Sequence, residues 1–208
     1  MVGTPPQLKR LAAGVAFAAA FFFSDSFAAG ESPSPGAKPS YVVTGQCRDG
    51  RPHGAYELHM PDGQLRVAGA FNQGKRIGTF LFWSTAGVRI ALLPYDDDSL
   101  SGTVALWYST GTARSVPKPK LEAVYANGQL FGAVRSWYPD GRPRAEYRYA
   151  KGALADARAW DAKGAALATA QARTLALRDA TEDRQFYNAL EGIVRDNPPQ
   201  CTAERTKA

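Results

Sequence analysis

The sequence contains few of the residues from which catalytic and metal sites are built. Among its 208 residues there are two histidines and two cysteines. His53 and His59 have no cysteine or suitably spaced carboxylates beside them, unlike the ligands of a zinc site. The sequence also lacks a nucleophile elbow, a P-loop and a dinucleotide-binding fingerprint. We therefore predict no catalytic residue, no metal and no cofactor, and a protein that is not an enzyme.

One stretch imitates a calcium-binding loop. Residues 95–102 read YDDDSLSG, in which Asp97, Ser99 and Ser101 resemble the start of an EF-hand loop. The twelfth position of such a loop needs a glutamate, but Tyr108 occupies it. We therefore expect a solvated turn here rather than a metal site.

The apolar run over residues 11–23 is too short for a membrane-spanning helix, which needs about 20 residues. Lys9 and Arg10 precede the run, and residues 26–28 (SFA) supply the small side chains that a signal peptidase reads. We predict that residues 1–28 are a secretory signal peptide and that the protein is exported, either periplasmic or secreted. An uncleaved N-terminal anchor is the alternative.

Residues 29–40, which follow the predicted signal, are rich in proline, serine and glycine, which is typical of a flexible linker.

The formal net charge is +6, and the basic residues are interspersed with acidic ones. A nucleic-acid-binding protein would need a clustered basic stripe. We therefore expect no nucleic acid among the partners.

Glycines recur with fixed steps of four and nine residues along the middle of the chain. Each tryptophan stands four residues before a glycine that closes one of these sets. A third set has Asp98 in place of its first glycine, and a fifth is one residue shorter. The pattern predicts five copies of a unit of about 24 residues, covering residues 41–166. The complete sets are Gly50, Gly54, Gly63; Gly74, Gly78, Gly87; and Gly128, Gly132, Gly141.

Each copy alternates runs of strand-forming residues with turn sequences. PDGQ at 61–64 and PDGR at 139–142 are typical of tight turns, and GTFLFW at 78–83 is typical of a strand. Each unit is therefore predicted to be a β-hairpin, joined to the next by a second turn. The predicted fold is mainly β: a single-layer antiparallel meander of about five hairpins.

The motifs CRDGRPHGAYELHMPDGQLRVAGAF and NQGKRIGTFLFW, over residues 47–83, resemble MORN repeats. The resemblance is to the bacterial variety found in YwqK-family antitoxins, and it covers about residues 45–167. It implies a hairpin-repeat fold that binds other molecules rather than catalysing a reaction. It also implies a narrower role, that of an antitoxin or immunity protein.

Residues 167–208 differ in character from the repeats. They lack alternation, are rich in alanine, leucine and charged residues, and include two prolines at 198–199. This composition predicts a helix of about 28 residues that ends before the prolines, with a break near residue 180 as an alternative. Its apolar stripe needs a surface to cover, and the sheet offers the only large one. The stripe consists of Phe186, Leu190, Ile193 and Val194.

The two cysteines lie near the two ends of the repeat region and its helix. Five hairpins with strands about 4.8 Å apart place the last copy roughly 40 Å from the first. A helix of about 28 residues is roughly 42 Å long. If the helix runs back along the sheet, Cys201 reaches the first strand, where Cys47 lies. We therefore predict a disulfide between Cys47 and Cys201, which an exported protein permits.

Alternation along the strands predicts which residues share a face of the sheet. One set is apolar, with Tyr56, Leu58, Phe80, Phe82, Val104, Leu106 and Val134, and the helix is expected to cover it. The other set is more polar and includes Arg66 and Arg144. It also carries the candidate binding residues, which are Trp83, Trp107, Trp137, Trp160 and Arg135.

Two interpretations of the tryptophans stay open. They could form an exposed aromatic stripe that stacks on sugars or grips the side chains of a partner. They could instead pack on one another and on the glycines, and so stiffen the sheet. We predict an exported, non-enzymatic repeat scaffold that binds a protein. Cell-wall glycan and membrane lipid head groups are the other partners considered, and the sequence leaves the oligomeric state open.

Overall fold

The computed structural model describes residues 40–201. The description below concerns these residues, which belong to one compact unit. The predicted signal peptide and nearly all of the predicted linker lie outside the described residues. Within residues 40–201, no helix is long and apolar enough to cross a membrane.

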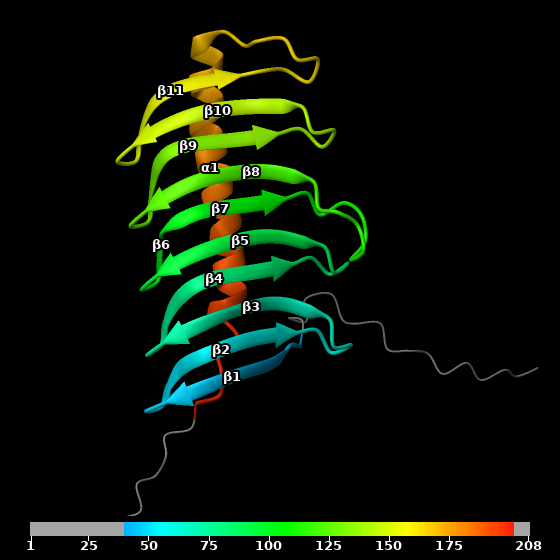
Figure 1. Ribbon diagram of the computed structural model, residues 1–208, viewed down its shortest axis with the longest axis vertical. Helices are drawn as coiled ribbons and strands as arrows, with labels where there is room; N and C mark the ends of the chain where they lie inside the picture. The colour runs from blue at the N-terminus through cyan, green and yellow to red at the C-terminus, as the bar shows by residue number, and fades with distance from the viewer. Residues whose placement is uncertain (1–39, 202–208) are drawn as a thin grey trace, which may run out of the picture. The chain divides into compact units, whose positions relative to one another are not determined.

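The described unit is one antiparallel sheet of eleven strands with a single helix, as predicted (Figure 1). The strands pair in chain order, except that the short β6 pairs only with β5, so the sheet is a meander. The elements are β1 (Val42–Arg48), β2 (Arg51–His59), β3 (Leu65–Asn72), β4 (Lys75–Trp83), β5 (Arg89–Asp96), β6 (Ser99–Leu100), β7 (Gly102–Trp107), β8 (Pro119–Ala126), β9 (Gln129–Trp137), β10 (Pro143–Ala150), β11 (Ala153–Ala159) and α1 (Thr169–Arg195).

The same backbone hydrogen bond joins each copy of the repeat to the next. It runs from the turn residue at the first-glycine position to a carbonyl in the preceding copy. The four bonds are Gly74 to Pro52 at 2.8 Å, Asp98 to Arg76 at 3.0 Å, Gly128 to Leu100 at 2.8 Å and Gly152 to Leu130 at 2.9 Å. The third copy is therefore in register, although aspartate replaces its glycine.

Asp98 keeps the conformation of the glycine that it replaces and adds a side-chain contact. Its φ is +70°, in the left-handed region that aspartate tolerates better than most residues. Its carboxylate accepts a hydrogen bond from Nε of Arg76 at 2.9 Å. The YDDDSLSG stretch is therefore a turn between β5 and β6, as the sequence predicts. Within residues 40–201 no group of histidine, cysteine and acidic residues could hold a metal.

The second glycine of each copy lies opposite an aromatic residue of the next strand. The pairs are Gly54 with Phe71, Gly78 with Tyr95, Gly102 with Tyr125, and Gly132 with Tyr149. All four aromatic side chains are buried. They join the predicted apolar set, from Tyr56 to Val134, in one core between the sheet and α1.

Helix α1 lies behind the sheet in Figure 1 and continues without the break considered near residue 180. Tyrosine hydroxyls of the sheet hold it at three levels. Tyr56 donates to the carbonyl of Asn197 at 2.8 Å, and Tyr95 donates to Glu191 at 2.8 Å. Tyr149 donates to the carbonyl of Ala176 at 3.4 Å. The sheet therefore holds the helix near both of its ends and also holds the segment that follows it.

The predicted disulfide is present. Cys47 of β1 is bonded to Cys201, with the Cα atoms 5.6 Å apart and a sequence separation of 154. Gly45 lets the tail, which is the segment between α1 and Cys201, approach β1 closely. A Cβ at this position would lie 2.6 Å from Pro199. The bond therefore ties the end of the chain across the first strand.

The last strand is protected from further pairing by the helix. In each earlier copy, the carbonyl at the equivalent position accepts a hydrogen bond from the turn N–H of the next copy. In the last copy this carbonyl belongs to Leu154. Here Arg173 of α1 donates to Leu154 at 3.4 Å and to Ala155 at 3.5 Å. Arg173 therefore caps an edge that would otherwise be a template for another strand.

Candidate functional site

Each tryptophan is the last residue before a closing turn. After Trp83, Trp137 and Trp160, the next residue donates its N–H to the residue that follows the turn glycine, and its carbonyl accepts from that glycine. After Trp107 the turn is longer, and Tyr108 donates to the carbonyl of Lys118 at 3.0 Å instead. Tyr138, for example, donates to Arg142 and accepts from Gly141, both at 2.8 Å. Asp161 makes the equivalent pair of bonds with Ala165 and Gly164. The four-residue spacing therefore marks the point at which a strand enters its turn.

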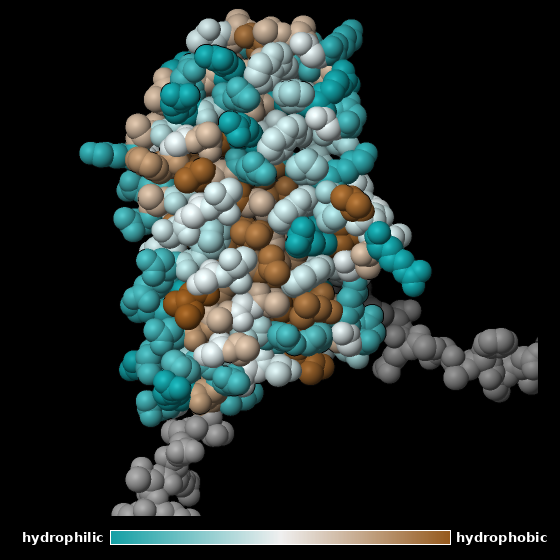
Figure 2. Space-filling view, in the orientation of Figure 1, coloured by the Kyte–Doolittle hydropathy of each residue, from teal (hydrophilic) through white to brown (hydrophobic). Residues whose placement is uncertain are grey.

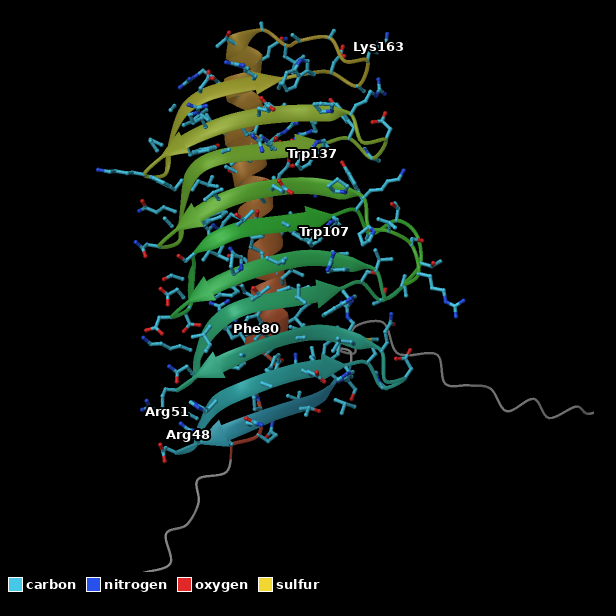
Figure 3. All side chains as sticks on the ribbon, in the orientation of Figure 1. Arg48, Arg51, Phe80, Trp107, Trp137 and Lys163 are labelled. Atoms are coloured by element: carbon cyan, nitrogen blue, oxygen red, sulfur yellow. A yellow bond between two sulfur atoms is a disulfide. The ribbon has the colours of Figure 1, made fainter. Side chains whose placement is uncertain are left out.

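The tryptophans stand at the ends of β4, β7 and β9 and directly after β11, and so form a row at one end of the strands. Figure 3 shows Trp107 and Trp137 at this end. Cross-strand pairing places Trp83 beside Arg89, Trp107 beside Pro119 and Trp137 beside Pro143. Paired residues point to the same face, so tryptophan alternates with arginine or proline along the row. With strands about 4.8 Å apart, successive tryptophans are about 10 Å apart. All four are half-buried, and Trp160 forms an isolated bridge with Ala166.

The tryptophans do not pack on one another. Within residues 40–201 no tryptophan ring contacts another aromatic ring. The guanidinium of Arg89 lies 4.4 Å from the ring centroid of Trp107 instead. The backbone at the tryptophans is fixed by the preceding copy, since Tyr108 donates to the Trp137 carbonyl and Tyr138 to that of Trp160, both at 2.8 Å. The row is therefore a rigid, partly exposed surface.

The middle of this open face, the face of the sheet opposite α1, is apolar. Leu81 pairs with Leu92, and Leu92 pairs with Ala105. Figure 2 shows apolar side chains gathered in the middle of this face and hydrophilic ones toward the C-terminal strands. The line of cross-strand pairs that begins at Leu81 and Leu92 continues toward the C-terminal strands with the exposed residues Glu122, Arg135, Glu146 and Arg158. Arg135 thus lies between two glutamates on neighbouring strands.

Two arginines are not where alternation places them. Arg66 and Arg144 were expected on the open face, but Arg66 is buried and donates to the carbonyl of Trp83. Arg144 reaches α1, where its two terminal nitrogens bind Asp179 at 2.6 and 2.8 Å. The register shifts by one residue beside each of them, so each is the extra residue of a β-bulge, which breaks the alternation of faces. Both stand three residues after a closing glycine, and that spacing is the signal in the sequence from which the two bulges could have been predicted.

Lys120 is the extra residue of the bulge beside Trp107. With Arg144 it lines a cleft of about 220 Å³ where α1 crosses the ends of β7 to β10. The sheet also contributes Tyr108 and Ser136, and α1 contributes Asp179, Glu182, Asp183 and Phe186. Tyr147 donates a third hydrogen bond to Asp179 at 2.8 Å, so this carboxylate is fully paired. Sequence reasoning missed the cleft, because its residues come from separate copies and from the helix.

Asp183 is the unpaired acid of this cleft. Within residues 40–201 no group donates a hydrogen bond to its carboxylate. Burial raises the pKa of Asp183 to about 6, and the nearby charge of Asp179 adds to the increase while Lys120 opposes it. The folded protein therefore holds this carboxylate at an energetic cost at neutral pH.

Replacing Asp183 with asparagine is expected to stabilise the protein at pH 7.5 by about 1 to 3 kcal/mol, because the charged form is disfavoured in the folded state. The folded protein binds the Asp183 proton more readily than the unfolded chain does. Stability of the natural protein should therefore rise as the pH falls from about 6 to about 4 through this group, and the advantage of the variant should vanish over that range. Urea unfolding of both proteins at pH 7.5 and pH 4.5 measures the difference, and a destabilised variant at pH 7.5 would contradict it.

No family model matches this chain, and no curated protein matches it. The resemblance to MORN repeats therefore remains a prediction from the quoted motifs.

Proposed function

We propose that this protein is an exported, non-enzymatic, MORN-like repeat scaffold that binds a protein partner through the open face of its sheet. The observation that supports this is the composition of that face. An antiparallel sheet with one solvated face usually alternates polar residues outward. Here Leu81, Leu92 and the tryptophan row lie on the uncovered side.

The open face has the parts of a protein-binding surface. Tryptophans and leucines are the anchors, because aromatic residues supply most of the binding energy at protein interfaces. Around them, Glu122, Arg135, Glu146 and Arg158 alternate in sign across four strands. Such a pattern favours a partner with complementary charges and rejects others. An antitoxin or immunity protein is a narrower form of the same proposal, since it too acts by binding a protein.

The export part of the proposal is supported by the disulfide. Structural disulfides persist in oxidising compartments and are rare in the cytosol. The pair Cys47–Cys201 is the only pair of cysteines in the sequence, and both are used.

Capture of a partner from the envelope fraction by the immobilised protein tests this function. Leu92→Arg, which places a charge in the middle of the open face, is expected to reduce capture at least about tenfold, because it buries an unpaired charge at the interface. Leu177→Arg is the matched control, since Leu177 is exposed on α1 and lies off this face. Thermal melts check that both variants are folded.

Three outcomes decide between the partner classes. Loss of capture in Leu92→Arg but not in Leu177→Arg supports a protein bound at the open face. Equal capture by both variants contradicts it. Co-sedimentation with peptidoglycan or anionic vesicles, abolished by Trp107→Ala with Trp137→Ala, would replace the protein partner with a glycan or a lipid surface.

A further inference from the structure

The cleft between α1 and the ends of β7 to β10 adjoins the tryptophan row, because Trp137 is one of its lining residues. Its volume of about 220 Å³ lies below the range of about 300 to 1,000 Å³ that is usual for sites of whole small molecules. It is therefore sized for the end of a side chain or a small head group. Its position beside α1 places it on the covered side of the sheet.

The charges of the cleft favour a cation. Arg144 and Asp179 neutralise each other through their paired hydrogen bonds. Glu182 lies at 3.6 Å from Arg178 on the same helix, in an exposed ion pair that is worth little. This leaves the carboxylate of Asp183 and the ammonium of Lys120, whose charge acts on it. Asp183 receives no hydrogen bond from residues 40–201. A half-buried carboxylate without a donor gains most from an incoming ammonium group.

The aromatic lining of the cleft also favours a cation, and Lys120 of the chain itself is an example. Phe186 and the ring of Tyr108 line the cleft, and aromatic faces attract cations. The ammonium of Lys120 already lies 5.7 Å from the ring centroid of Phe186. It lines the cleft and its charge acts on Asp183, but it forms no ion pair within 4.0 Å with a described residue. Lys120 thus shows that this place accepts a lysine ammonium and leaves Asp183 without a direct partner.

We propose that this cleft binds the ammonium group of a lysine side chain on a protein partner, with Asp183 as its counter-ion and Phe186 as its aromatic wall. The proposal rests on the proposed function only in taking the partner to be a protein. Lys120 competes with the incoming lysine, so its removal strengthens binding. The open face and the cleft are then two contact regions that meet at Trp137.

The test uses a single lysine in place of a partner, so it can fail independently of the proposed function. Nα-acetyl-lysine methylamide and its uncharged counterpart, Nα-acetyl-norleucine methylamide, are titrated into the purified oxidised protein at low salt. Amide NMR shifts of Ser136, Asp183 and Phe186 report occupancy. We expect the lysine derivative to bind with a dissociation constant of about 1 to 10 mM, and the norleucine derivative at least about tenfold more weakly.

Three variants separate binding from folding. Asp183→Asn is expected to weaken lysine binding at least about fivefold although it stabilises the fold, so unfolding cannot explain the loss. Lys120→Met, which keeps an apolar chain over Phe186, is expected to strengthen binding about threefold. Asp156→Asn, a change of an exposed carboxylate on β11, should have no effect. Equal binding of both derivatives, no binding of either, or unchanged binding in Asp183→Asn overturns the proposal.

Discussion

Replacing Cys47 and Cys201 by serine is expected to lower the free energy of unfolding by about 3 to 5 kcal/mol, because the bond closes a long loop in the unfolded chain. The two cysteines are separated by 154 positions in sequence, and the loop between them includes nearly all of the repeat sheet and all of α1. Loss of the bond also frees the tail that crosses β1 at Gly45. Urea unfolding of the oxidised protein and of the double-serine variant gives the difference.

The control for this prediction is reduction of the natural protein. Dithiothreitol should lower its stability to that of the double-serine variant and leave the variant unchanged. The Tyr56 hydrogen bond to Asn197 remains in both and should keep the end of the helix near β2. A loss below about 1 kcal/mol would mean that the loop closure contributes little here.

Replacing Asp179 with alanine is expected to cost about 3 kcal/mol or more, since it leaves a largely buried guanidinium without its carboxylate. The side chain of Asp179 is 9% exposed and that of Arg144 is 24% exposed. The hydrogen bonds to Asp179 raise the pKa of Arg144 above its ordinary value. The hydroxyl of Tyr147 loses its acceptor in the same variant. Chemical denaturation at pH 7 measures the cost.

Two further variants isolate the cause of this loss. Asp156→Ala removes an exposed carboxylate 3.7 Å from Arg158, and should change stability by no more than about 0.5 kcal/mol. Arg144→Met combined with Asp179→Leu removes both charges, and should recover most of the stability lost in Asp179→Ala. If the double change is as damaging as the single one, packing rather than charge pairing dominates this contact.

The repeat spacing predicts most of the fold, because its turns are local. A glycine or aspartate in the left-handed region fixes each turn within a few residues, and the same backbone bond recurs between copies. The disulfide could be predicted for a related reason. A meander of known strand spacing and a helix of known rise have matching lengths, so Cys201 reaches β1 if the helix runs back along the sheet.

The bulges and the cleft could not be read from alternation. An extra residue at Arg66 or Arg144 reverses the expected face, and alternation contains no sign of it. The bulges can be recognised in the sequence only by aligning the repeats, which shows that each lies three residues after a closing glycine. Asp183 and Phe186 meet Lys120 only because α1 runs back over the sheet, which is a tertiary contact with no local signal.

Site-specific photo-crosslinking tests the proposed function most directly. The photoreactive residue p-benzoylphenylalanine is placed at position 92 of the open face, or at position 177 of α1, and the protein is irradiated with its captured partner. The account predicts a crosslinked protein from position 92 and none from position 177. A crosslink from position 177 alone would show that the partner binds the helix side, and would contradict the open face as the binding surface.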